Sequence, residues 1–193
     1  MSNKDNGNVR DLFGGALSCF FPTNALDMSE IREVPNNQEV FHHQKTDQSI
    51  MFDILEYQDQ VHGSEAIKYH YMDIAEVNDA SEEAEVNTVE EIPKENLSIK
   101  ECSQALFLLG RQMISKYKEG ADAKNLVNIL MVLYRLPQYE TDLLIIMNDP
   151  VAISTKSSSS GNNTTPNDAS KWSEKLFKQI ACSLKIVDSS LFG

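Results

Sequence analysis

Acidic and amide side chains are concentrated in a short segment, residues 32–41, where their spacing suits partner binding through charge and hydrogen bonds. Pro35 fixes its own φ angle, and the two asparagines that follow it favour a tight turn before an apolar strand. Because a turn anchored by a strand holds its side chains in the open with little mobility, we expect Gln38 and Glu39 to lie on a rigid rim. This segment is the first candidate for a functional site.

The sequence lacks the common catalytic and cofactor motifs. It contains no Gly-x-x-x-x-Gly-Lys-Ser/Thr loop, no Gly-x-Gly-x-x-Gly turn and no Gly-x-Ser-x-Gly elbow, so we expect neither nucleotide binding by the chain itself nor hydrolase chemistry. His42 and His43 are neighbours in a predicted strand and point to opposite faces, whereas His62 and His70 lack helical ligand spacing. We therefore expect no metal, no cofactor and no catalytic residue.

The cysteines are odd in number and widely spaced, without a Cys-x-x-Cys pair: Cys19, Cys102 and Cys182. This pattern indicates buried free thiols in a reducing compartment. Residues 1–11 are polar and contain no long apolar run, which argues against a secretory signal or a membrane anchor. We expect the protein in the nucleus and the cytoplasm.

The chain is strongly acidic, with a formal net charge of -12 from 29 acids and 17 bases. This charge opposes unassisted binding to nucleic acid or anionic lipid and favours a basic partner surface. Residues 73–95 contain many acids and a single base, Lys94, which indicates either an acidic binding face or a solvated connection. No coiled-coil seam is visible, so a monomer is expected.

Length and composition favour one α+β domain. A chain of 193 residues that is 41% hydrophobic can enclose a single core. We expect a flexible N-terminus over residues 1–10 and one domain over residues 11–193. Within that domain, a Ser-, Thr- and Asn-rich segment at about residues 154–167 cannot bury enough surface to order itself, so a mobile loop is predicted there.

Apolar runs predict the strands, at residues 16–21, 39–43, 49–57, 105–117, 126–136 and 143–147. Gly14 and Gly15 form a bend before the first run. Residues 49–57 and 105–117 also allow a helix, although alternate apolar residues in 105–109 favour a strand covered on both faces. Pro137 and the two residues after it predict a hairpin-like connection between the last two strands.

Helices are indicated by caps and by apolar spacing. Asp27 caps a single helical turn over residues 27–31, and Ser64 caps a longer helix with one apolar stripe. A C-terminal helix is expected from about residue 169 to residue 183. The apolar stripes of the two longer helices, which should pack on a sheet, comprise Ile67, Tyr71 and Ile74, and then Trp172, Leu176, Ile180 and Leu184.

Six segments in register resemble the Ran guanine nucleotide release factor family: LFGGA (12–16), VPNNQEV (34–40), DQS (47–49), YHYMD (69–73), RLPQYETDL (135–143) and DSSLFG (188–193). The resemblance covers nearly the whole chain. It implies an antiparallel sheet flanked by helices in an α/β/α sandwich of the PsbP-like kind. It also implies a protein that is not an enzyme, that binds the GTPase Ran, promotes loss of its bound GTP and supports nuclear protein import.

The resemblance places the partner surface at about residues 30–73. Two acids mark that surface in the family pattern Pro-Asp-x-Gln-Glu, and they correspond to Asn36 and Glu39. Asn36 keeps the shape and hydrogen bonding of an aspartate without its charge, which makes Glu39 the principal candidate. The proposed Ran-binding set comprises Glu39, Asn36, Gln38, Glu33, Asp27 and Asp47.

A second class of function stays open from sequence alone. A trafficking adaptor with the same fold would hold a basic protein segment on an acidic face without altering nucleotide release. Its affinity would depend on residues 73–95 more than on Glu39.

Overall fold

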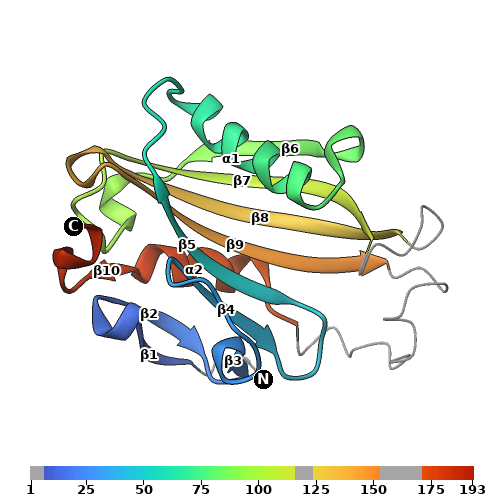
Figure 1. Ribbon diagram of the computed structural model, residues 1–193, viewed down its shortest axis with the longest axis horizontal. Helices are drawn as coiled ribbons and strands as arrows, with labels where there is room; N and C mark the ends of the chain where they lie inside the picture. Colours follow the sequence, from blue (N-terminus) through green and yellow to red (C-terminus); the bar gives the residue numbers. More distant parts are fainter. Residues whose placement is uncertain (1–6, 116–123, 153–170) are drawn as a thin grey trace.

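Two antiparallel sheets and two α-helices form the described part of this computed structural model, residues 7–115, 124–152 and 171–193 (Figure 1). The larger sheet has the strand order β3-β4-β5-β9-β8-β7-β6, and the smaller has the order β1-β2-β10. The strands are β1 (Gly7–Leu12), β2 (Leu17–Pro22), β3 (Ala25–Asp27), β4 (Gln38–His43), β5 (Ser49–Glu56), β6 (Glu85–Glu91), β7 (Gln104–Ser115), β8 (Lys124–Leu136), β9 (Thr141–Ala152) and β10 (Lys185–Ile186). The helices are α1 (Ser64–Val77) and α2 (Glu174–Ser183). The fold is α+β, as predicted.

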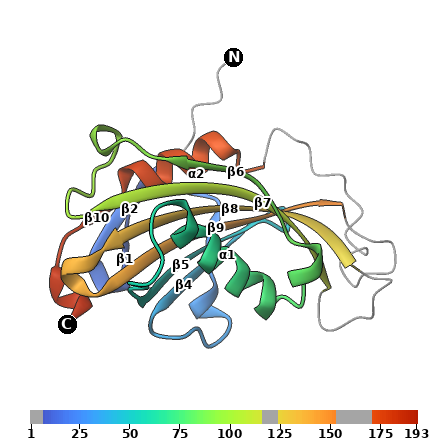
Figure 2. The ribbon, with the colours of Figure 1, turned by 90° about the horizontal axis from the view of Figure 1, so that it is seen from above.

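The central strands of the larger sheet are covered on both faces. Figure 2 shows α1 and α2 on opposite sides of this sheet. In β7, Ala105 and Phe107 join the core on the α2 side, whereas Leu106 and Leu108 join the core beneath α1. This alternation confirms the prediction of a strand buried on both faces. The predicted hairpin is also present, because a short 3-10 turn at Pro137–Tyr139 connects the paired strands β8 and β9.

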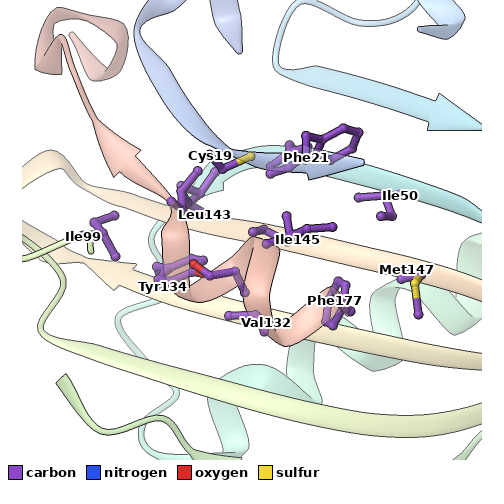
Figure 3. Close-up of a cluster of buried hydrophobic side chains, with 14 of the residues drawn as sticks. Cys19, Phe21, Ile50, Ile99, Val132, Tyr134, Leu143, Ile145, Met147 and Phe177 are labelled. Atoms are coloured by element: carbon purple, nitrogen blue, oxygen red, sulfur yellow. The ribbon is translucent and has the colours of Figure 1, made fainter. Parts of the chain in front are cut away.

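The larger core lies between α2, the smaller sheet and the α2-side face of the larger sheet. Figure 3 shows Phe21 from β2, Tyr134 and Ile145 from the central strands, and Phe177 from α2 gathered in this core. All four are almost fully buried. The Tyr134 hydroxyl, which would be costly to bury alone, donates a hydrogen bond to the Ala181 carbonyl at 2.7 Å. This bond fixes the end of α2 against β8.

The smaller sheet corrects the expectation for the N-terminus. Residues 7–10, predicted to be flexible, form most of β1, which pairs along its length with β2. The strand is polar in sequence, and its order comes from this backbone pairing and from the burial of Leu12. Residues 1–6 and the predicted mobile loop at 154–167 lie outside the described residues.

Both helices begin at positions that differ from the prediction. Ser64 is the first residue of α1, and the N-cap is Gly63, so Ser64 does not cap the helix. The predicted stripe is present, with Ile67 and Tyr71 fully buried. Helix α2 begins at Glu174, where the Ser173 hydroxyl accepts a hydrogen bond from Leu176 N. Its predicted start at residue 169 lies outside the described residues, and residues 171–173 precede the helix.

Candidate partner-binding surface

The proline turn is tied to the strand beside it. Gln38 N donates to the Pro35 carbonyl at 2.9 Å, and Ile54 N of β5 donates to the Asn37 carbonyl at 2.9 Å. The Asn37 side-chain amide donates to Asp53 Oδ1 at 2.9 Å and to the Ile54 carbonyl at 3.2 Å. Backbone and side chain thus anchor the turn to β5, which explains how an exposed loop can hold a defined shape.

Gln38 and Glu39 point to opposite faces of the larger sheet. The Gln38 amide donates to Asp53 Oδ2 at 3.0 Å on the α1 side. Glu39 lies on the other side, where its Oε1 accepts a hydrogen bond from Phe13 N at 2.6 Å. The two residues expected at a rigid rim therefore do not share one face, because successive side chains of a strand alternate between the two faces.

A glycine bend presents the amide that binds Glu39. Phe13 has a φ of 50°, and Gly14 and Gly15 that follow it have φ values of 66° and 97°. Backbone of this kind is readily available only to glycine, so the two glycines allow the chain to reverse into β2. The predicted glycine bend is confirmed. It turns the Phe13 N–H toward Glu39 instead of pairing it within a sheet.

Glu39 belongs to a small charged cluster at the junction of the two sheets. Arg10 Nη2 of β1 lies 3.2 Å from Asp27 Oδ2, and its guanidinium stacks 4.4 Å from the centre of the Phe41 ring. Burial raises the pKa of Glu39 above its ordinary value. The hydrogen bond from the Phe13 amide lowers this pKa, the charge of Asp27 raises it and the charge of Arg10 lowers it, but the pKa stays raised. Two carboxylates therefore share one arginine, which leaves the cluster negative when both are ionised.

Asp27 also caps the turn that precedes the proline segment. Its Oδ1 accepts hydrogen bonds from Ser29 N at 2.9 Å and from the Ser29 hydroxyl at 2.6 Å, which confirms the predicted cap. Burial raises the pKa of Asp27, but the Ser29 hydrogen bonds and the Arg10 charge outweigh it, and the pKa lies below its ordinary value. Asp27 stays ionised beside Glu39 at neutral pH.

The six predicted site residues fall into separate places. Asp27 and Glu39 meet at the charged cluster, and Glu33 and Asn36 are exposed on the proline turn. Gln38 and Asp47 instead line a groove on the α1 side. Sequence reasoning missed Arg10, because it lay in the segment expected to be flexible, and Asp53, because only the tertiary structure brings it against the turn.

Two apolar side chains near Asp27 in the sequence are exposed. Ile31, directly before the proline turn, is 69% exposed, and Leu26 of β3 is 44% exposed. Leu26 precedes Asp27 in β3, so its side chain points to the opposite face of the strand, and Ile31 follows the 3-10 turn that Asp27 caps.

The acidic stretch 73–95 lies far from this surface in the fold. It spans the end of α1, a 3-10 turn at Ser81–Glu83 and the edge strand β6, at the other end of the larger sheet from β3. Two of its acids pair with lysines, Glu83 with Lys124 and Glu90 with Lys178. The proline turn and the acidic stretch are therefore two distinct surfaces.

The histidines and cysteines do not assemble a metal site in the described ranges, where no cluster of three or more His, Cys, Asp or Glu residues occurs. His43 is buried with its ring 5.0 Å from that of Trp172, while His42 faces the groove on the α1 side, so the two do point to opposite faces. All three cysteines are free, as predicted, although Cys182 is only half-buried. No α-helix in the described residues is long and apolar enough to cross a membrane.

The chain matches a family model over most of its length. The model described as Ran-interacting Mog1 protein covers residues 10–150, which include the charged cluster and the whole proline turn. The chain belongs to the Ran-interacting Mog1 family. This confirms the resemblance drawn from the sequence motifs.

Relatives of this Mog1-family chain match it nearly end to end. A protein of Danio rerio named Ran guanine nucleotide release factor is 47% identical over 186 residues, covering 95% of this chain and 99% of the relative. The Homo sapiens protein of the same name is 40% identical over 183 residues, covering 94% and 95% respectively. A nuclear import protein of Schizosaccharomyces pombe, mog1, is 28% identical over 187 residues, with 94% and 98% covered.

Solved structures support the same fold. The crystal structure of the Saccharomyces cerevisiae Ran-binding protein Mog1p superposes with a TM-score of 0.73 at 25% identity, covering 98% of this chain and 100% of the other. Cyanobacterial PsbP from Synechocystis gives a TM-score of 0.52 at 12% identity, with 96% of each chain covered. The second likeness concerns the fold alone, and it confirms the PsbP-like architecture expected for the Mog1 family.

Proposed function

We propose that this protein binds the small GTPase Ran, promotes release of its bound guanine nucleotide and supports nuclear protein import. It acts as a regulator of a GTPase and not as an enzyme, and it works in the nucleus and the cytoplasm. The observation that carries the proposal is its membership of the Ran-interacting Mog1 family, with relatives named Ran guanine nucleotide release factor that match nearly the whole chain.

We assign Ran binding to the surface formed by the charged cluster and the exposed proline turn. Glu39 is its centre, Asp27 and Glu33 add negative potential, and Asn36 adds hydrogen-bonding capacity. One oxygen of Glu39 is held by the Phe13 amide, which orients the carboxylate. A carboxylate accepts about four hydrogen bonds, so Glu39 keeps acceptor capacity for a partner.

Gln38 and Asp47 receive different roles in this proposal. Gln38 holds the turn through Asp53 and does not point toward Glu39, so it acts by fixing the turn. Asp47 lies in the connection between β4 and β5 and contributes only long-range negative potential. Such potential speeds association with a basic surface and is screened by salt.

Nucleotide release requires differential binding. A GTPase holds its nucleotide through magnesium, a lysine and backbone N–H groups, all of which present positive potential to an approaching acid. A fixed carboxylate stabilises the state of Ran in which those contacts are disturbed. Each tenfold loss of nucleotide affinity requires about 1.4 kcal/mol of tighter binding to the loosened state.

The test is the rate at which Ran loses a fluorescent GTP analogue, and separately a GDP analogue, when this protein is added. Glu39→Lys reverses the central charge and is expected to remove most of the acceleration. Glu39→Gln retains an oxygen that accepts from Phe13 N, so it isolates the effect of charge from that of the hydrogen bond. Glu76→Lys, an equal charge change at an exposed position of α1, is the matched control and should leave release unchanged.

The outcomes separate the two parts of the proposal. Acceleration and binding that survive Glu39→Lys at wild-type levels contradict the assigned surface while leaving the function in place. Binding to Ran without any acceleration by the wild-type protein contradicts the release function and favours the adaptor class.

A further inference from the structure

A groove lies on the α1 side of the larger sheet, between the end of α1 and the connection from β4 to β5. Its volume is about 420 Å³, within the range of about 300–1,000 Å³ typical of ligand sites. Helix α1 packs on β6, β7 and β8, whereas β4 and β5 lie toward the opposite edge of the same sheet (Figure 1). Apolar side chains from four elements form the lining: Met51, Ile74, Val127 and Ile146.

The charged side chains around the groove are acidic. Asp47 and Asp53 both line it, and none of the described lining residues is a lysine or an arginine. The other polar lining groups are amides, a hydroxyl and the imidazole of His42. An apolar floor bordered by carboxylates complements a ligand that carries an apolar body and a positive charge.

Asp53 is a buried carboxylate with remaining capacity to bind a cation. It is 7% exposed, and its two oxygens each accept one hydrogen bond, from Asn37 and from Gln38. Each carboxylate oxygen has a second acceptor site. Burial raises the pKa of Asp53 to about 6, and a cation placed in the groove would favour the ionised form.

The shape of the groove favours a segment of another protein over an engulfed small molecule. Val77, part of its lining, is 87% exposed, so this wall is open to solvent. A small ligand typically buries most of its surface, which requires an enclosed site. The net charge of -12 adds long-range attraction for a basic chain.

We propose that this groove binds a basic segment of a partner protein, which lays an apolar side chain over Met51 and Ile146 and places a lysine or arginine beside Asp47 and Asp53. The site is separate from the surface assigned to Ran, because Glu39 points to the other face of the same sheet. Asp53 links the two sites, because it lines the groove and also accepts the hydrogen bonds that hold the proline turn.

The experiment measures binding of a fluorescein-labelled peptide of alternating leucine and arginine by fluorescence anisotropy. A peptide of alternating leucine and glutamate serves as the charge-reversed probe. Val77→Lys places a cation at the exposed wall of the groove, and Val9→Lys makes the same charge change at a 77% exposed position of β1 in the smaller sheet. Neither substitution disturbs the core, and circular dichroism checks that both variants fold.

The expected result is binding of the arginine peptide that Val77→Lys weakens at least about tenfold, because like charges oppose each other across an interface. Val9→Lys should change affinity by less than about twofold, since it lies away from the groove. Equal effects of the two variants, or equal binding of the glutamate peptide, would overturn the proposal.

Two further results assign the groove to other occupants and also overturn it. The first is a dimer in sedimentation that Val77→Lys dissociates, which identifies a second copy of the chain. The second is displacement of the bound peptide by phenethylamine at similar concentration, which identifies a free amine.

Discussion

Replacement of Asp142 by asparagine tests whether buried charge balance holds the loop before α1. Asp142 is fully buried on β9, and its Oδ2 binds His70 Nε2 at 2.9 Å and Gln58 N at 3.2 Å. Arg135 Nε lies 2.8 Å from Asp142 Oδ1, as an ion pair without the alignment of a hydrogen bond. The same guanidinium donates to the Val61 and Gln58 carbonyls at 2.9 and 2.7 Å, which joins β8 to that loop.

The cost follows from what asparagine cannot supply. In one orientation, the amide oxygen of Asp142→Asn accepts from His70 and Gln58, but its NH2 group then faces the N–H of Arg135, so two donors meet. In the reverse orientation, the NH2 group faces the N–H donors of His70 and Gln58. Arg135, whose side chain is 3% exposed, also loses its buried counter-charge. Removing one partner of a buried pair costs about 3–5 kcal/mol. This is a large share of a total stability of about 5–15 kcal/mol.

Urea unfolding measures this loss. The single tryptophan, Trp172, is 3% exposed and reports unfolding by its fluorescence. Glu174→Gln is the control, because it removes an exposed ion pair with Lys178 at 2.9 Å and should cost less than about 1 kcal/mol. If Asp142→Asn costs no more than this control, the argument from buried charge is refuted.

Two more predictions concern the α1 side of the larger sheet. Gly110→Ala would place a Cβ 2.6 Å from the Tyr71 ring, whose hydroxyl is held by the Arg111 carbonyl at 2.8 Å, so we expect a loss of about 1–3 kcal/mol; an unchanged thermal midpoint would contradict this. Burial raises the pKa of Asp53 from 3.8 to about 6, so between about pH 4 and pH 6 the folded state holds a proton that the unfolded state has released. The contribution of Asp53 to stability therefore falls as pH rises through this window, by about 3 kcal/mol at about 1.4 kcal/mol per pKa unit. Urea unfolding of wild type and Asp53→Asn should give a stability difference that changes by this amount, and a difference independent of pH would rule the argument out.

Hydrophobic pattern favoured the correct strands at the centre of the fold. In β7 both alternating sets of residues are apolar, which favoured a strand between two layers, although the sequence also allowed a helix there; the structure has the strand, with the two sets in the two cores. Pro137 and the apolar runs around it likewise predicted the β8–β9 hairpin. These are local signals, because they depend on neighbours within one segment.

The helix starts and the N-terminal strand were harder to predict from the sequence. Ser64 is a good N-cap residue, yet Gly63 occupies the cap because its φ of 54° suits the approach of the chain to α1. The polar strand β1 has little propensity of its own, and its partner β2 supplies the hydrogen bonds that order it. Whether such a segment forms a strand depends on the neighbouring strand of the sheet and not on its own sequence alone.

The sequence by itself determined the family, the α+β class and the proline turn with its acids, because motifs, apolar periodicity and turn residues act over short distances along the chain. Only the tertiary structure decided which acids meet. Strand alternation separates Gln38 from Glu39, and sheet packing brings Arg10 to Asp27 and Asp53 to the turn across gaps of 17 and 16 residues. The charge state and orientation of a carboxylate depend on burial and on such distant partners, which exist only once the chain has folded.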